Sequence, residues 1–435
     1  MRRVDPAWMD PHARLEAAER ADPAGHAMHL AAAAAWGFAQ SISNAAEGIA
    51  WGILLAVCVL RIPKAWRCWS VPLRSPLWLA LAAWSSWIAL SALWSPVQQP
   101  SMRDHFPDRW LLTPLMLWPV MGRAWVVLAA IAAGAFVQAG IAIALSWGPT
   151  GMARYMSVRS ASAFGQLQWQ LHCAVALGAA GIRWLPLPGR VASGAGLAAA
   201  LVVVSRAATR ITALSSVAAM AIVATRPPPR TASGRRARIA AVACLVALVA
   251  VAAFLPVGIR IRKNALSALR AADGDAAMRL VDSMTGHRST LAAAALDIGS
   301  EHPWAGSGRG AFQALLPEWA RERQHLYPEQ ATILEPLTAG TINDAHNAFL
   351  QSFVDAGVGA ALLLAALLAG ILVRLWRASR SDAVAAAALA LLSAIVLGAF
   401  SHPIAAKAPG AIIAVCLAVA MRPAPRAPAA GPVRV

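Results

Sequence analysis

The chain has 435 residues, of which 59% are hydrophobic and only 13% are charged, and its mean hydropathy is +0.56. This composition excludes an ordinary soluble domain of this length and indicates a protein that crosses a membrane several times. The net charge of +18 comes from basic residues spread over short segments beside apolar runs, without an aromatic-interleaved basic domain that could form a nucleic-acid groove. Membrane lipids are therefore expected as partners, and nucleic acid is not.

Apolar runs bounded by charged residues or proline recur along the chain. A helix needs about 20 apolar residues to cross the hydrocarbon core, and continuous runs favour helices over the alternating strands of a barrel. The sequence thus predicts an all-α polytopic membrane protein with about twelve transmembrane helices. The predicted spans lie at 28–45, 46–61, 76–95, 110–122, 124–146, 167–185, 190–206, 208–225, 239–257, 347–373, 383–400 and 404–421. Residues 28–61 could instead form one long tilted helix, because polar residues interrupt the run.

Basic residues indicate the orientation of these spans. Under this count, Lys and Arg collect on one side, within 61–74, 226–238, 374–380 and 422–434, and that side is expected to be the cytoplasm of a bacterial inner membrane. The predicted order is a cytoplasmic N-terminal tail (1–27), nine spans (28–257), a large periplasmic loop (258–345), three spans (346–421) and a cytoplasmic C-terminal tail (422–435). The first 27 residues do not have the pattern of a cleavable signal.

The polar segment 258–345 is the most informative part of the chain, because a transporter or an anchor needs no such segment. Half of the 20 acidic residues lie in it, and short helices are expected near 264–282, 287–301 and 308–325. A glycine-rich turn that contains Gly306 and Gly308 precedes the last of these helices. It could present backbone N–H groups to a phosphate, or it could be a tight connection between two helices.

Cysteines and carboxylates give no sign of a metal site. Four of the five cysteines lie in predicted spans, so neither a disulfide framework nor a zinc site is expected. Outside the N-terminal tail and the polar segment, too few carboxylates remain to cluster around a magnesium ion. No cofactor and no metal are therefore expected.

His346 and several arginines are the candidate functional side chains. His346 stands where the polar segment meets a span, a setting in which a neutral imidazole can accept a proton, although such a histidine can also be structural. Arg206 and Arg210 are four residues apart, on one face of a helix, and lie at the outer surface under this topology, as do Arg154 and Arg159. The alternative for such arginines is contact with lipid phosphate.

These residues fall into a recognisable order. The run Ala345-His346-Asn347-Ala348-Phe349-Leu350-Gln351, followed by Asp355, Gly357 and Gly359, resembles the His-Asn, aliphatic, Gln, acid, Gly signature of the O-antigen ligase and polymerase superfamily, which includes the protein O-oligosaccharyltransferases. Gly286-His287-Arg288, the run 302–308 with Phe312, and Ser205-Arg206 are similar to upstream positions of that family. The resemblance covers about residues 150–410. The spacing of the glycines after the histidine departs from the family, and Gly165-Gln166-Leu167-Gln168 lacks the Pro and Asn of the protein-glycosylating branch.

The resemblance implies a metal-independent, inverting glycosyltransferase. It would move a preassembled glycan from a polyprenyl pyrophosphate to an acceptor hydroxyl at the periplasmic face, with His346 as general base and Arg288 stabilising the departing pyrophosphate. Asp344 is expected to orient the loop or His346. The remaining residues that the resemblance assigns to substrate binding are Arg206, Arg210, Arg154, Arg159, Asn347, Gln351, Gly306 and Gly308.

The acceptor distinguishes three related activities. Lipid A-core as acceptor would make the protein an O-antigen ligase, which the large late loop favours by analogy. A second lipid-linked glycan would make it a polymerase, and a Ser or Thr of a secreted protein would make it a protein O-oligosaccharyltransferase. A transporter of lipid-linked saccharides is the rival class, but it predicts inverted repeats and buried mid-membrane charges that the sequence does not show.

Overall fold

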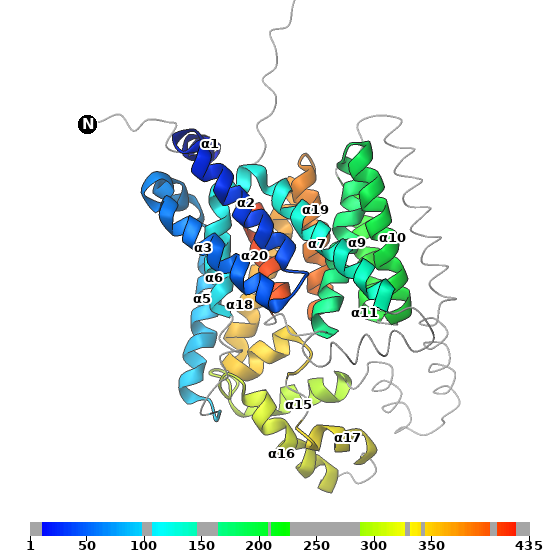
Figure 1. Cartoon of the computed structure of the whole chain (residues 1–435). Helices are drawn as coiled ribbons and strands as arrows, with labels where there is room; N and C mark the ends of the chain where they lie inside the picture. The colour runs from blue at the N-terminus through cyan, green and yellow to red at the C-terminus, as the bar shows by residue number, and fades with distance from the viewer. Residues whose placement is uncertain are drawn as a thin grey trace, which may run out of the picture.

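The structure is a computed structural model, and it describes residues 11–97, 107–145, 164–207, 210–226, 288–326, 331–340, 344–400 and 407–422. Within these residues every regular element is a helix (Figure 1). Most helices form an apolar bundle, and a small group, α15–α17, lies at one end of it (Figure 1). The predicted span 239–257 and the predicted helix 264–282 lie outside the described residues.

The first three helices settle the alternatives for residues 28–61. Helices α1 (Pro11–Ala21), α2 (Pro23–Ala39) and α3 (Asn44–Ala65) are separate, so the polar interruption is a turn between two helices. Ser43 caps α3, since its side chain accepts a hydrogen bond from the Ala46 N–H. Helix α1, which the sequence did not predict within the N-terminal tail, packs on two short 3₁₀ segments, η2 (Trp66–Trp69) and η5 (Trp118–Arg123).

The central helices continue the bundle. They are α4 (Ser70–Leu73), α5 (Pro76–Leu90), η3 (Ser91–Trp94), α6 (Pro107–Leu117), α7 (Ala124–Leu145), α9 (Phe164–Trp184), α10 (Leu187–Ala207) and α11 (Arg210–Thr225). Glycines let some of them approach closely: a Cβ on Gly134 of α7 would lie 2.3 Å from the Phe38 carbonyl oxygen of α2. Small residues at helix contacts are typical of membrane bundles, where tight packing replaces the hydrophobic effect.

The last helices close the bundle and connect it to the group α15–α17, called the polar layer below. They are α15 (Arg288–Glu301), α16 (Ala311–Leu326), α17 (Ala331–Thr338), α18 (Ala348–Ala378), α19 (Ala383–Ala399) and α20 (Lys407–Met421). The observed α15 and α16 lie where the sequence predicted short helices at 287–301 and 308–325. Both pack against α18, so the polar layer is attached to the helix that follows His346.

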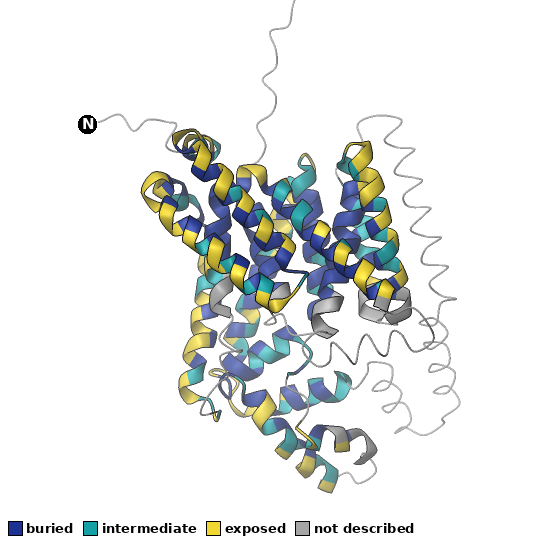
Figure 2. Ribbon diagram, viewed as in Figure 1, coloured by how far each residue is buried: buried dark blue, intermediate teal, exposed yellow. Residues whose placement is uncertain are grey.

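Five stretches of the described residues are long and apolar enough to cross a membrane. They are Asn44–Leu73, Pro76–Trp94, Leu111–Ala144, Leu187–Val204 and Ala348–Ala378, and shorter apolar helices occur at Leu214–Thr225, Ala383–Ala399 and Pro409–Met421. Large apolar side chains remain exposed on the bundle, such as Leu60 (71%) and Leu362 (65%), while the helix contacts are buried (Figure 2). The chain is a helical, multi-pass membrane protein. The number of twelve spans and their orientation stay predictions.

Candidate active site

The candidate site is built around a break in α18. Ala356 and Gly357 have non-helical backbone angles, with φ 82° and ψ 179° at Gly357. That combination is almost restricted to glycine, because a Cβ would clash with the flanking peptide groups. Such a break leaves helical backbone N–H and C=O groups without their usual partners.

The turn formed by residues 303–310 fills this break. The Ser307 N–H donates to the Val354 carbonyl (2.7 Å), and the Val358 N–H donates to the Pro303 carbonyl (2.8 Å). The two backbones touch, since a Cβ on Gly357 would lie 2.2 Å from the Trp304 carbonyl oxygen. Gly357 and the glycines of the turn at 303–310 belong to two separate sequence motifs. Glycine is needed at these positions because the two backbones pack directly on each other.

The same turn is held from the other side by the end of α5 and by η3. The Trp94 indole N–H donates to the Gly306 carbonyl (3.2 Å), and the Trp87 indole N–H donates to the Ala356 carbonyl at the break (2.7 Å). The Ser95 hydroxyl donates to the Arg309 carbonyl (2.7 Å). Three elements that are distant in sequence thus share one set of backbone hydrogen bonds.

The N–H groups of the glycine-rich turn have partners inside the protein. Those of Gly306, Ser307, Arg309 and Gly310 donate to His302 O, Val354 O, Ser91 O and the Asp355 carboxylate, respectively. A phosphate cradle would need such groups to point at the ligand. The structure therefore shows a tight connection between two helices, and substrate binding by Gly306 and Gly308 stays a prediction. Gly308 approaches η3, where its Cβ would lie 2.4 Å from the Ser95 Cα.

Two polar side chains hold the chain on both sides of His346. The Asn347 side-chain oxygen caps α18 by accepting from the N–H groups of Phe349 (3.0 Å) and Leu350 (3.2 Å). The Gln351 side chain accepts from the Ala345 N–H (2.9 Å) and donates to the Asp355 carboxylate (3.0 Å). These contacts fix the side chains of Asn347 and Gln351 at the start of α18, and their role in substrate binding stays a prediction.

His346 occupies an unusual backbone conformation beside a carboxylate. Its φ is 48°, and His346 is the single non-glycine residue with positive φ in the described part of the chain. The Asp344 Oδ1 atom lies 2.7 Å from the His346 backbone N and 2.6 Å from its Nδ1. A carboxylate can only accept here, so Nδ1 carries the proton, and Nε2 of a neutral ring keeps the lone pair. The histidine side chain is 35% exposed and Asp344 is 24% exposed, so the pair is reachable.

Arg288 is the first residue of α15, and the packing of α15 brings it toward the same end of α18. Leu291, one turn later, is 1% exposed in an apolar cluster that also contains Ala345 and Val354. Farther along α15, Gly299 lies against the Phe353 ring, which a Cβ would approach to 2.4 Å. The start of α15 thus packs in the same apolar cluster as Ala345, the residue before His346.

Arg206 and Arg210 lie at the junction of α10 and α11, where the structure describes only their backbone. Helix α11 ends beside the far end of α18, because the Arg226 guanidinium lies 3.6 Å from the Trp376 ring centroid. The start of α11, with Arg210, therefore lies toward the end where α18 begins (Figure 1). Arg154 and Arg159 lie outside the described residues.

Residues 192–365 match the family model described as O-antigen ligase. This segment belongs to the O-antigen ligase superfamily. No curated protein matches the chain. The matched segment, the O-antigen ligase domain below, contains α10, α11, α15–α17 and the first part of α18. It therefore includes His346, Arg288 and the turn at 303–310, and the resemblance predicted from the motifs is confirmed.

Some residues of the site were not predicted from the sequence. Trp87, Trp94 and Ser95 precede the O-antigen ligase domain by about a hundred residues of chain, yet they hold its turn and its helix break. Arg309 lies within the turn and is only 6% exposed. In the sequence, an arginine between two glycines could have indicated Arg309, whereas no local pattern indicates the tryptophans. Among the described residues, no cluster of three His, Cys, Asp or Glu side chains could hold a metal ion.

Proposed function

We propose that the protein is an inverting glycosyltransferase of the O-antigen ligase type. It moves a preassembled glycan from a polyprenyl pyrophosphate to an acceptor hydroxyl at the periplasmic face of a bacterial inner membrane. The observation that carries this proposal is the His346–Asp344 pair at the start of α18, inside the O-antigen ligase domain and reachable from outside the bundle. A sugar hydroxyl is a poor nucleophile, and this pair supplies the base that it needs.

The proposed reaction is a single displacement. The Nε2 atom of His346 accepts the proton of the acceptor hydroxyl while its oxygen attacks the anomeric carbon from the face opposite the pyrophosphate. The new glycosidic bond forms as the bond to the pyrophosphate oxygen breaks, so the anomeric configuration inverts. Asp344 keeps the proton of the neutral ring on Nδ1 and stabilises the imidazolium that forms, as in other carboxylate–histidine pairs.

The arginines balance the charge of the leaving group. Arg288 is the main candidate, and Arg206 with Arg210 lies toward the same end of the bundle as His346. Guanidinium groups stay ionised and offer paired hydrogen bonds to phosphate oxygens, so they stabilise a departing pyrophosphate without proton transfer. Arg154 and Arg159 are proposed as further contacts to the donor.

Lipid A-core is the proposed acceptor, with a second lipid-linked glycan or a protein Ser or Thr as the alternatives. The test supplies purified protein with a polyprenyl-pyrophosphate glycan and each acceptor in turn, and it quantifies the product. Transfer to lipid A-core alone is the expected result. Transfer to a second lipid-linked glycan would make the protein a polymerase, and transfer to a protein Ser or Thr would make it a protein O-oligosaccharyltransferase. The absence of transfer to any acceptor would overturn the proposal.

The role of His346 is tested in the same assay. His346→Ala should lower the turnover number by at least about a hundredfold, the usual contribution of a general base. His325→Ala is the matched control, because His325 is an exposed histidine of the polar layer, in the last turn of α16, and should leave turnover unchanged. Full transfer by His346→Ala would disprove the role of His346 as the general base.

A further inference from the structure

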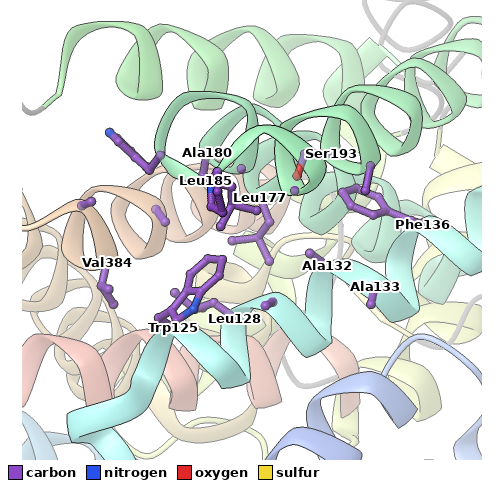
Figure 3. A pocket seen from close by; sticks show the side chains of 18 residues that line it. Trp125, Leu128, Ala132, Ala133, Phe136, Leu177, Ala180, Leu185, Ser193 and Val384 are labelled. Atoms are coloured by element: carbon purple, nitrogen blue, oxygen red, sulfur yellow. The ribbon is translucent and has the colours of Figure 1, made fainter.

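An apolar hollow, called the slot below, lies away from His346, among α7, α9, α10 and α19 (Figure 3). Its volume is about 670 Å³, within the range of small-molecule sites. Trp125 and Leu128 of α7 face Leu177 and Leu185 of α9 and of the turn that follows it (Figure 3). Most other lining residues are alanine or glycine, and the polar group of Ser193 is an exception. The walls therefore suit a hydrocarbon chain.

The dimensions of the slot match one membrane leaflet. Its rim contains Trp125 at the start of α7, Trp184 at the end of α9 and Ala383 at the start of α19, so it lies where these helices end. Along α7 the lining continues to Phe136, which is about 16 Å farther at the rise of an α-helix. This length is about half of a 30 Å hydrocarbon core. The slot thus begins at one membrane surface and follows the helix axes toward the middle.

Two arginines lie next to residues of the rim, and the guanidinium of one of them, Arg183, also donates to the Val223 carbonyl of α11. The Arg183 guanidinium lies 5.6 Å from the ring of Trp184, and the Arg190 Nε donates to the Leu185 carbonyl (2.6 Å). Trp184 and Leu185 both line the slot, so two positive charges flank its mouth. The nearby carboxylate of Asp382 is paired with Arg422 at 3.6 Å, which leaves the rim positively charged.

We propose that this slot binds one diacyl phospholipid with an anionic headgroup. An acyl chain fills the apolar slot, and the headgroup phosphate binds Arg183 and Arg190 at the mouth. Charge complementarity selects this occupant, because a zwitterionic lipid fills the slot equally well but carries no net charge for the arginines. The site lies at the end of the bundle away from α15–α17, so it is separate from the proposed donor site and does not depend on the proposed reaction.

Lipid binding can be measured by native mass spectrometry of the full-length protein in a neutral detergent. The probes are phosphatidylglycerol and phosphatidylcholine, added separately. The wild type should retain one phosphatidylglycerol with an affinity about tenfold higher than that for phosphatidylcholine, the effect of a charge-assisted hydrogen bond. Equal retention of the two lipids, or retention of neither, would overturn the proposal.

Two neighbouring positions on α10 give a matched pair of variants. Ala192 lines the slot, whereas Val191 does not and is 66% exposed. Ala192→Trp should weaken phosphatidylglycerol binding at least about tenfold, which corresponds to the loss of roughly two buried methylene groups. Val191→Trp should bind like the wild type. Ala133→Leu fills the slot from the α7 wall and should act like Ala192→Trp, so the result does not depend on one variant folding.

The charge at the mouth is tested separately. Arg190→Gln should lose the preference for phosphatidylglycerol and keep the weaker binding of phosphatidylcholine, while Arg67→Gln, an exposed arginine in η2, should keep the preference. A polyprenyl phosphate that displaces phosphatidylglycerol from this slot at equal concentration would identify a different occupant and contradict the proposal.

Discussion

Indole-to-carbonyl hydrogen bonds occur at both ends of the bundle, but the contacts that accompany them differ. At the site end, which contains α15–α17, the turn at 303–310 and the start of α18, backbone groups bond across the break at Gly357, and indole groups donate to backbone carbonyls. At the basic end, which contains α1, η2 and η5, charged side chains also form ion pairs that join distant segments. Glu19 of α1, for example, binds Arg123 of η5 at 3.1 Å.

Arg61 is the centre of the basic end. It is 2% exposed, and it donates to the Asp22 carboxylate (3.2 Å) and to Nδ1 of His29 (3.0 Å). A guanidinium can only donate, so Nδ1 of His29 accepts, and its Nε2–H donates to the Met116 carbonyl (2.7 Å). Lys64 adds a second contact to Asp22 at 3.2 Å. Asp22 offsets the buried charge of Arg61, and Nδ1 of His29 stays unprotonated because it accepts from the guanidinium.

The comparison of the two ends shows where the backbone adopts unusual angles. The basic end uses capped helices and paired charges, which fix three helices without unusual backbone angles. The site end contains His346 at φ 48° and Gly357 at φ 82°. Strained backbone persists only where surrounding contacts enforce it, and it concentrates at functional sites. Contacts from α5 and η3 enforce the break at Gly357, and Asp344 holds His346.

The largest expected effect on stability comes from a substitution at the helix break. Gly357→Ala places a Cβ 2.2 Å from the Trp304 carbonyl oxygen in a conformation nearly exclusive to glycine. Thermal unfolding in detergent should show a loss of at least about 4 kcal/mol, from the backbone strain and the overlap together. Gly359→Ala is the control, because nothing lies within 4 Å of its Cβ and it should be neutral or slightly stabilising. Similar melting of both variants would mean that the break is not formed.

Arg61→Ala tests the basic end. Removing the buried guanidinium leaves Asp22 with Lys64 and the Gly25 N–H and leaves Nδ1 of His29 without this donor, so stability should fall by about 3 kcal/mol. Glycan transfer per folded molecule should be unchanged, because the network is remote from His346. Arg67→Ala, at an exposed arginine, should cost less than about 0.5 kcal/mol. A loss of transfer in folded Arg61→Ala protein would show that the two ends are coupled.

Trp94→Phe sharpens the comparison at the site end. It deletes the indole N–H that holds Gly306, and it should cost about 1 kcal/mol, the net value of a hydrogen bond. Trp78→Phe is the matched control, because Trp78 of α5 donates to the Leu111 carbonyl (3.2 Å) away from the turn. Both variants should lose similar stability, but only Trp94→Phe should lower the turnover number of glycan transfer. Equal turnover in both would limit Trp94 to a role in folding.

The smallest expected effect concerns acid stability at the basic end. Burial raises the pKa of Asp22, but hydrogen bonds from Lys64 and Arg61 outweigh it, so the pKa lies below its ordinary value of 3.8. A carboxylate with a lowered pKa adds stability above its unfolded pKa and loses it as the pH falls through the folded value. The melting temperature should therefore drop below about pH 4, and Asp22→Asn should flatten that drop. Glu16→Gln, at an exposed carboxylate of α1, should retain the wild-type profile.

Much of the helical framework could be predicted from the sequence. Apolar runs placed α3, α5, α7 and α18 close to their observed bounds, because hydropathy over about 20 residues is a local property. The motif residues around His346 were also found, and the contact between Asp344 and His346 agrees with the expected role of Asp344. Helix α1 was missed, because an apolar run is a poor signal for a short polar helix that is stabilised by its contacts with η2 and η5.

The roles of several motif residues could not be predicted in the same way. Asn347, Gln351 and Gly306 were predicted to contact the substrate, and only the structure shows which groups of the protein their polar atoms bind. A sequence shows that a polar side chain or a glycine is present and does not show which partner satisfies it. Partners are set by the meeting of segments that are far apart, as with Trp94 and Gly306, which are 212 residues apart.

The sequence by itself determined the class of the protein, the positions of most of its helices and its likeness to the O-antigen ligase superfamily. Each of these follows from composition or from short motifs along the chain. Only the tertiary structure decided that α18 breaks at Gly357, that a turn from the polar layer fills the break and that tryptophans outside the O-antigen ligase domain hold both. Hydrogen bonds between distant segments leave no periodic pattern in a sequence, because their geometry exists only after the helices have packed.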